Sequence, residues 1–334
     1  MTNLFKILFF STTILGTIVS ISSISWFTAW MGLEINLISF IPLMKTNNKF
    51  TTEASMKYFM VQAMASVFLL FSIIIFTNSK EFSFFISETP SIFISSALFL
   101  KLGAAPFHFW FPETCSGLSW NINLILLTWQ KIAPMMLIFI STKMPLFFCL
   151  IALASSLIGG IQGLNQTCLR KIMAYSSINH MGWMISAILN SFNNWLVYFL
   201  IYSAINFNII MVFKKLNSFF IPHLSKMTSY SKPMKMFFSL NFLSLGGLPP
   251  FLGFLPKWIT IFNLTSNKFF CLMILLIIFS LISLYFYLRI TFSSLTLQST
   301  ESLNSFMTKM KFWDFFINSV SLLGLLLCSM IPFD

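Results

Sequence analysis

Apolar runs of close to twenty residues recur along the whole chain and constrain its fold more than any other feature. A helix needs about 20 apolar residues to cross the hydrocarbon core of a bilayer. Charged residues make up only 8% of the 334, against roughly 25% in a soluble domain. A chain so poor in charge cannot cover a water-facing surface, so lipid is its main solvent. The runs lie near 4–24, 26–43, 56–78, 88–109, 119–140, 144–165, 171–190, 194–213, 235–266, 269–290 and 313–332.

These runs predict an all-α polytopic membrane protein of about eleven transmembrane helices in a single domain, residues 1–334. The first run follows one lysine, Lys6, and precedes no soluble domain or clear cleavage site, so we interpret it as a span and not as a secretory signal. An amphipathic, Arg-rich import sequence is also missing, as expected of a protein made inside an organelle.

The distribution of Lys and Arg predicts the topology, because such residues accumulate on the inner side of a membrane. With the N-terminus inside, fourteen fall on the inner side and three on the outer side, while three more lie within the membrane. The net charge of +12 is therefore mostly a topology signal and gives no reason to expect nucleic acid as a partner.

Two Gly/Pro clusters indicate a faint internal repeat with an offset of 144 residues. They lie five spans apart, in the fourth and the ninth predicted spans, and an odd difference would give the copies opposite orientations in the membrane. We expect an antiporter-like inverted repeat (about 4–140 and 144–290, then a C-terminal helix at 313–332), since broken helices in inverted halves are typical of ion pathways in transporters. Ordinary helix kinks are the alternative. The predicted breaks include Gly103 and Pro106 in the first copy, and Gly246, Gly247, Pro249 and Pro250 in the second.

Four charged residues lie inside predicted spans or at a break: Glu34, Lys101, Lys131 and Lys257. Each charge at mid-bilayer costs roughly 2.5–3.5 kcal/mol, so each must face protein or water. Lysines in such places can exchange protons, and Glu34 can serve as the counter-charge of Lys101. A structural salt bridge of Glu34 with Lys101, and a Lys257 that extends to the interface, are the alternatives.

Two histidines are candidates for the same relay. His108 follows the first break and His180 lies in the seventh span, where a neutral imidazole could pass protons between lysines with the help of water. Packing residues held by hydrogen bonds are the alternative. Glu53 and Glu113, near the inner face, could be surface charges or a proton entrance.

Other kinds of chemistry find no support in the sequence. The five cysteines are far apart and form no CxxC pair, which argues against a disulfide framework, a zinc site or an iron–sulfur cluster. No GxGxxG or Walker-type loop is present, so nucleotide binding has no support either. We expect no catalytic, metal-binding or cofactor-binding residues. A GxxxG of Gly159 and Gly163 in the sixth span predicts a close helix neighbour.

At these motifs the sequence resembles subunit 2 of mitochondrial NADH–ubiquinone oxidoreductase (respiratory complex I), in its insect-like form. The matching blocks lie within residues 30–258 and are WMGLEINLISFIPL, TEASMKYFMVQAMAS, LFLKLGAAPFHFW, TWQKIAP, GLNQTCLRKIMAYSSINHMGWM and NFLSLGGLPPFLGFLPKW. The tail after about residue 290 carries little of the pattern.

The resemblance implies an antiporter-like subunit of the complex I membrane arm, in the mitochondrial inner membrane. The Lys and Arg distribution then predicts that the N-terminus lies on the matrix side. The resemblance implies a charge pair of Glu34 and Lys101, a central Lys131 and a terminal Lys257. It also implies other membrane-arm subunits and lipids as partners, with NADH, FMN, iron–sulfur clusters and ubiquinone bound elsewhere.

Together these features predict a proton-translocating subunit of NADH:ubiquinone reductase with no redox centre of its own. In this hypothesis, separation of Glu34 from Lys101 drives a proton toward Lys131 and then Lys257. Two alternatives stay open. A stand-alone cation/proton antiporter would use the same groups and would transport when reconstituted alone, whereas a purely structural membrane subunit would tolerate neutral residues at the three lysines.

Overall fold

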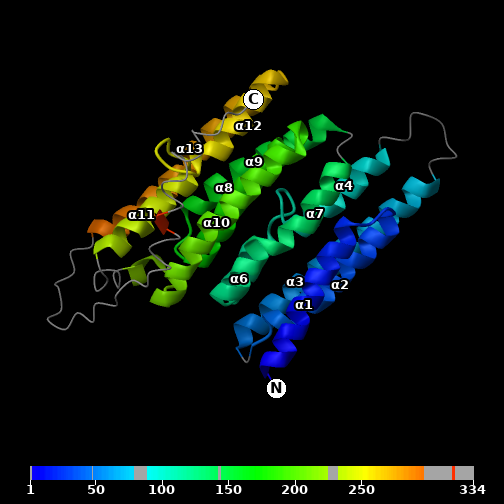
Figure 1. Ribbon diagram of the computed structural model, residues 1–334, viewed down its shortest axis with the longest axis horizontal. Coiled ribbons are helices and arrows are strands. Elements are labelled where there is room, and N and C mark those ends of the chain that lie inside the picture. Colours follow the sequence, from blue (N-terminus) through cyan, green and yellow to red (C-terminus); the bar gives the residue numbers. More distant parts are fainter. Residues whose placement is uncertain are drawn as a thin grey trace. The chain divides into compact units, whose positions relative to one another are not determined.

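A computed structural model describes residues 2–46, 48–78, 89–141, 144–224, 232–296 and 318–319. In these ranges the chain forms thirteen named α-helices, α1 to α13 (Figure 1). The β structure described there is one isolated bridge between Cys168 and Phe220. The predicted all-α class is thereby confirmed.

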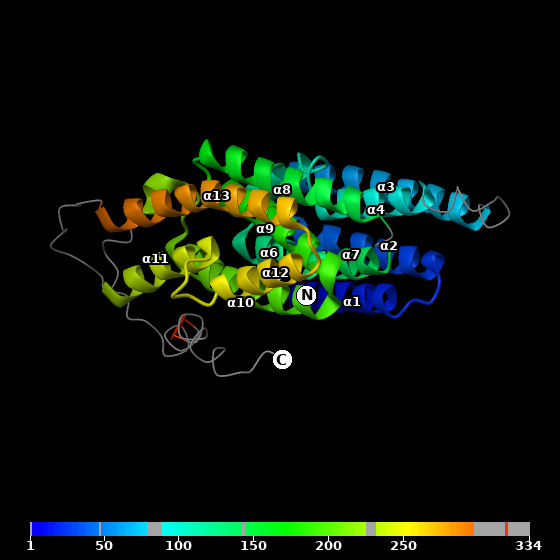
Figure 2. The ribbon, with the colours of Figure 1, turned by 90° about the horizontal axis from the view of Figure 1, so that it is seen from above.

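The chain divides into two compact units, residues 1–154 and 155–334. In the first unit α1 packs on α2, α3 lies against α2, α4 and α5, and α7 contacts α4 and α1 (Figures 1 and 2). Its helices are α1 (Thr2–Ile21), α2 (Trp26–Met44), α3 (Lys49–Asn78), α4 (Thr89–Leu102), α5 (Trp110–Gly117), α6 (Trp120–Leu127) and α7 (Trp129–Ile140). A further helix, α8 (Pro145–Leu164), begins in this unit and ends in the second.

In the second unit α9 is the central helix. Most of its residues are buried, and it packs against α10, α12 and α13, while α11 lies along α13 (Figure 1). Burial on all sides explains how α9 can carry Ser, Asn and His, since protein surrounds these polar groups. The helices of this unit are α9 (Leu169–Asn190), α10 (Phe192–Leu216), α11 (Lys232–Gly246), α12 (Phe254–Ser266) and α13 (Phe270–Thr296).

Most predicted spans coincide with long apolar helices. Seven helical stretches in the described part of the chain are long and apolar enough to cross a membrane. Three other predicted spans are helical but differ from a simple apolar helix: 88–109 contains the short α4 and a break, 171–190 is the polar α9, and 235–266 divides into α11 and α12. The predicted span 313–332 lies outside the described residues, apart from Asn318 and Ser319.

Glycines allow α1 and α2 to approach closely. A Cβ atom added to Gly32 would lie 2.6 Å from the backbone nitrogen of Ser20, and one added to Gly16 would lie 2.8 Å from that of Asn36. Small residues at such crossings permit backbone-to-backbone packing in lipid, where no hydrophobic force drives helices together. The sequence carries Gly16 and Gly32 in separate spans, so no GxxxG motif marks this contact.

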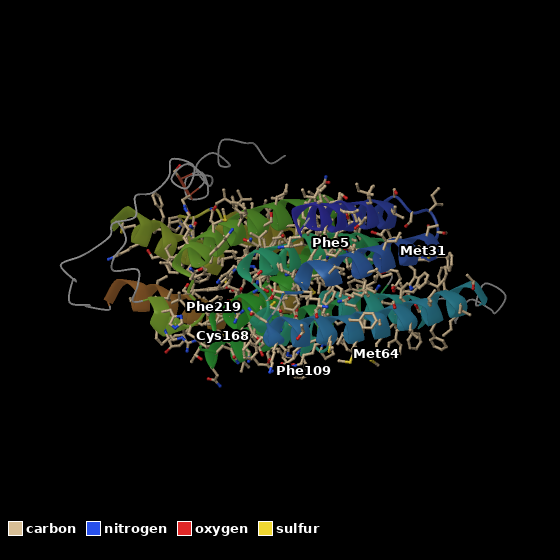
Figure 3. The ribbon with its side chains drawn as sticks, turned by 90° about the horizontal axis from the view of Figure 1, so that it is seen from below. Phe5, Met31, Met64, Phe109, Cys168 and Phe219 are labelled. Atoms are coloured by element: carbon tan, nitrogen blue, oxygen red, sulfur yellow. The ribbon has the colours of Figure 1, made fainter. Side chains whose placement is uncertain are left out.

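The outer surface of the described helices is apolar, as lipid requires. Large side chains such as Met64 and Phe109 project outward from the ribbon with 60% and 70% of their surface exposed (Figure 3). Phe and Met residues therefore occur both in the core and on the outside.

Candidate functional site

The first helix break begins at Gly103, which has a φ of 72°. Its backbone nitrogen donates to the carbonyl of Leu100 (3.2 Å), and the nitrogen of Ala104 donates to that of Phe99 (3.1 Å). This is the pattern of a Schellman C-cap, in which a left-handed residue ends a helix and satisfies its last carbonyls. A further turn follows, in which Phe107 donates to the carbonyl of Ala104 (2.8 Å).

The second break repeats this pattern at Gly247, which has a φ of 79°. Its nitrogen donates to the carbonyl of Ser244 (3.0 Å), and the nitrogen of Leu248 donates to that of Leu243 (3.4 Å). The following turn is closed by a hydrogen bond from Phe251 to Leu248 (3.0 Å). Each donor and acceptor is 144 residues after its counterpart in the first break.

The ends of the helices on either side of the breaks also differ by 144 residues. The helix before the first break ends at Leu102 and the next begins at Trp110, while the corresponding residues at the second break are Gly246 and Phe254. Prolines in both interruptions lack the backbone N–H that would continue a helix. The shared hydrogen bonds make a chance pair of kinks a poor explanation and favour the predicted repeat. An inverted arrangement of the two copies stays a prediction.

Side-chain donors bond to backbone carbonyls whose usual i+4 N–H donor is lost at each break. At the first break Gln62 Nε2 donates to the carbonyl of Lys101 (3.0 Å) and Trp110 Nε1 donates to that of Leu100 (3.2 Å). At the second, Lys257 Nζ donates to the carbonyl of Gly246 (2.8 Å). A cation there also meets the negative end of the α11 helix dipole.

A cavity in the first unit contains both Lys101 and Lys131 in its wall. Lys101 leaves 7% of its surface exposed and Lys131 only 2%. The cavity has about 20 Å³ of room for the centres of water molecules, which exceeds the ~10–15 Å³ that one water requires. The structure thus brings two of the predicted relay residues to one space that can hold water. The other residues of the wall are Leu33, Asn36, Leu37, Tyr58, Gln62, Leu102, Trp110, Phe111, Leu126, Gln130 and Pro134.

Lys131 lies just after an interruption that the sequence did not predict. The predicted span 119–140 forms one apolar helical stretch, Trp120–Ile140, which an irregular turn at Thr128 divides into α6 and α7. The Thr128 hydroxyl donates to the carbonyl of Leu124 (2.7 Å). A Thr side chain that bonds back to residue i−4 bends a helix. Pro134 adds to the irregularity, because it leaves the carbonyl four residues earlier without its helical donor. Lys131 Nζ also lies 5.8 Å from the centroid of the Phe111 ring.

Glu34 lies on α2, half-buried, with its Oε1 atom buried and without a hydrogen-bond partner among the described residues. No ion pair within 4 Å joins Glu34 to Lys101, and both are described residues. The structure therefore shows the predicted pair in a separated arrangement. The burial of this oxygen carries a desolvation cost that a water or a cation beside it would offset.

In the second unit Lys257 is buried against the α11 end and lies 5.6 Å from the ring centroid of Trp183 on α9. A Cβ atom at Gly247 would lie 2.8 Å from Cδ of Lys257. A side chain at residue 247 would therefore require the end of the Lys257 side chain to move. The side chain does not extend to an interface, as the alternative reading of Lys257 required.

His180 lies one helical turn before Trp183 and is also buried. Its Nδ1 lies 2.8 Å from the hydroxyl of Tyr198, and its ring is 5.2 Å from that of Tyr202. A small cavity lies beside these three residues, with about 10 Å³ for water centres. Both a packing role and a relay role are compatible with this setting.

The remaining candidates lie apart from the first cavity. His108 is buried in the first break, with its Nδ1 3.2 Å from the carbonyl oxygen of Pro106 and its ring against Phe109. Glu113 forms an exposed ion pair of 2.6 Å with Lys57, and Glu53 is exposed. Among the described residues no group of three or more His, Cys, Asp or Glu could hold a metal ion.

Sequence reasoning missed the neutral polar residues of the site. Asn36 and Gln130 form a reciprocal amide pair in the wall of the lysine cavity, and Gln62 and Tyr198 contact the first break and His180. The available signal was an uncharged polar residue inside a predicted span, which in lipid requires a hydrogen-bond partner.

Comparisons with known proteins decide the family. The family model described as the transmembrane domain of NADH:quinone oxidoreductase/Mrp antiporter matches residues 23–283. The NADH-ubiquinone oxidoreductase chain 2 of Anopheles gambiae is 48% identical over 329 residues, covering 95% of each chain. This chain belongs to that family. The corresponding protein of Locusta migratoria is 46% identical over 92% of this chain and 90% of its own.

Solved structures share this fold at low sequence identity. A chain of respiratory complex I from Thermus thermophilus superposes with a TM-score of 0.86 at 21% identity, over 98% of this chain and 79% of that one. A chain of an Mrp complex from Dietzia gives 0.74 at 15% identity, over 88% of this chain and 61% of that one. The antiporter-like fold predicted from the breaks is confirmed.

Proposed function

We propose that this chain is a membrane-arm subunit of a proton-pumping NADH:ubiquinone oxidoreductase in the mitochondrial inner membrane, and that it moves protons through its buried charged residues. Its membership of the chain 2 family supports the assignment to the oxidoreductase. In this proposal NADH, FMN, iron–sulfur clusters and ubiquinone bind to other subunits, and the energy of their reaction arrives here as a conformational or electrostatic signal.

One observation carries the proton role: Lys101 and Lys131 line the same water-sized cavity. Two cations are costly to bury side by side, because burial penalises each and they repel one another. A proton on either lysine therefore disfavours a proton on the other. This coupling is what a relay needs, since a charge that arrives at one site expels the charge at the next.

Glu34 supplies the switch in this proposal. When it approaches Lys101, it favours the protonated lysine, and when it withdraws, Lys101 releases its proton toward Lys131. The separated arrangement seen here corresponds to the second condition. Lys257, which is held by the carbonyl of Gly246 in place of a carboxylate, is the terminal carrier of the relay.

A native gel of detergent-solubilised mitochondrial membranes tests the assignment. We expect this chain to run in the large band that stains for NADH dehydrogenase activity. A chain that migrates alone, away from that activity, would instead favour a free cation/proton antiporter. This outcome would overturn the assignment.

Replacement of Lys131 by Met tests the relay itself. Met keeps much of the length and apolar stem of Lys but cannot carry a proton, so we expect a normally assembled complex whose NADH-driven proton pumping is lost or stalled. Lys57→Met, at an exposed lysine of the same unit, is the matched control and should pump normally. Normal pumping by the Lys131→Met complex would overturn the relay.

A further inference from the structure

The wall of the cavity that contains Lys101 and Lys131 also contains a reciprocal pair of side-chain amides, Asn36 and Gln130. Asn36 Nδ2 donates to Gln130 Oε1 (2.9 Å), and Gln130 Nε2 donates to Asn36 Oδ1 (3.0 Å). Asn36 lies on α2 two residues after Glu34, and Gln130 lies on α7 directly before Lys131. The pair thus joins the helix of the switch to the helix of the central lysine.

Each amide retains hydrogen-bonding capacity after this pairing. A side-chain amide has two N–H donors and two acceptor lone pairs, and the reciprocal pair uses one of each on both residues. Among the described residues these two side chains form no other hydrogen bond. Both amides line the cavity with room for water, so a water there would find a donor and an acceptor beside the two lysines.

We propose that Asn36 and Gln130 are positioning residues that hold the water through which Lys101 and Lys131 exchange a proton. This inference rests on the proton-relay function proposed above. The water accepts a hydrogen bond from the remaining N–H of one amide and donates one to the free lone pair of the other. It then has one lone pair left to accept a proton from the protonated lysine and one hydrogen left to give to the neutral lysine.

Amides suit this place for two physical reasons. They do not ionise, so they neither trap the proton nor add a further charge to a site that already contains two lysines. They also donate and accept at the same time, so the same pair supports a water oriented for transfer in either direction. Leu33, Leu126 and Phe111 in the wall cannot form such bonds.

The test separates a water-holding pair from one that only fixes the packing. In Asn36→Leu/Gln130→Met the two side chains keep similar shapes but lose all hydrogen bonding, and paired apolar replacement of this kind leaves stability nearly unchanged. In Asn36→Gln/Gln130→Asn both amides are kept with their lengths exchanged. Each variant is measured in the intact complex for assembly, for NADH-driven proton pumping and for the solvent deuterium isotope effect on pumping.

We expect the apolar double variant to assemble but to pump about tenfold more slowly, which corresponds to ~1.4 kcal/mol on the barrier. Its isotope effect should rise, because proton transfer then limits the rate, and the exchanged variant should restore both readouts. Normal pumping by an assembled apolar variant would overturn the inference and leave the lysine relay standing. Normal pumping by Lys131→Met would instead overturn the relay.

A second measurement decides the matter even if the apolar variant fails to assemble. The unmodified complex, solved by electron cryo-microscopy at a resolution that shows water, should contain an ordered water within hydrogen-bonding distance of Asn36 or Gln130 and of a lysine. A well-resolved cavity without such a water contradicts the inference.

Discussion

At the scale of single residues, Gly247 combines two demands that no other residue type meets. Its φ of 79° lies in the left-handed region, where a side chain is strained. Its missing Cβ also leaves the space that the Lys257 stem occupies, since a Cβ there would lie 2.8 Å from Cδ. One glycine therefore both ends α11 and positions the amino group that caps it.

Gly247→Ala should accordingly destabilise the second break and displace Lys257. We expect a loss of about 1–3 kcal/mol from backbone strain alone, together with slower proton pumping, because Lys257 loses its place on the Gly246 carbonyl. Gly246→Ala is the matched control. Its nearest neighbour would be 3.6 Å away and its φ is not positive, so both the melting temperature and pumping should stay near wild-type values.

The sequence predicted residues of this kind well, because Gly and Pro act through the local backbone. Asn36 and Gln130 could not be paired in advance, since 94 residues separate them in the sequence. They become partners only because the fold brings α2 and α7 to the same cavity. Likewise the proximity of Lys101 to Lys131 depends on three-dimensional packing, whereas their presence inside the membrane follows from hydrophobicity alone.

At the scale of elements, α8 shows how one motif serves two neighbours. A Cβ at Gly159 would lie 2.6 Å from the backbone nitrogen of Asn179 on α9, whereas Gly163 faces the ring of Phe286 on α13. The GxxxG pattern predicted a single close neighbour, and the structure instead gives each glycine its own. Residues four apart lie on the same side of a helix but one turn apart along it, so each glycine can meet a different neighbour.

Gly159→Ala should therefore force α8 away from α9. Overpacking of this kind costs typically ~1–3 kcal/mol, so we expect the complex to lose this chain at a lower temperature when heated before a native gel. Gly160→Ala, next to it on α8, meets its nearest atom only at 3.4 Å and should change the dissociation temperature little. Equal behaviour of the two variants would contradict the close contact of α8 with α9.

Elements were harder to predict where polar groups interrupt them. Continuous hydrophobicity predicts the span 119–140, and the structure has one apolar helical stretch there, yet Thr128 interrupts the helix three residues before Lys131. Hydrophobicity reports the solvent of a segment and not its backbone path. The breaks at Gly103 and Gly247 were visible because they carry left-handed glycines and prolines, which a Thr-mediated bend lacks.

At the scale of the whole molecule, the uneven distribution of Lys and Arg predicts that the N-terminus lies in the matrix. Seven predicted crossings separate Asn48 from Ser266, so these residues should lie on opposite sides of the membrane. Both are exposed in the structure. An error of one span would place them on the same side, which makes this pair a direct test of the span count as well as of the orientation.

Asn48→Cys and Ser266→Cys, each in a chain whose exposed Cys271 is replaced by Ser, can be labelled with a membrane-impermeant maleimide. We expect Cys at 48 to react only in inside-out vesicles, where the matrix side is accessible, and Cys at 266 only in mitoplasts. The parent chain with the Cys271→Ser replacement gives the background. Labelling of both from one side would refute the odd number of crossings between them. If Cys at 48 reacted only in mitoplasts and Cys at 266 only in inside-out vesicles, the predicted orientation would be reversed, but the predicted number of spans would stand.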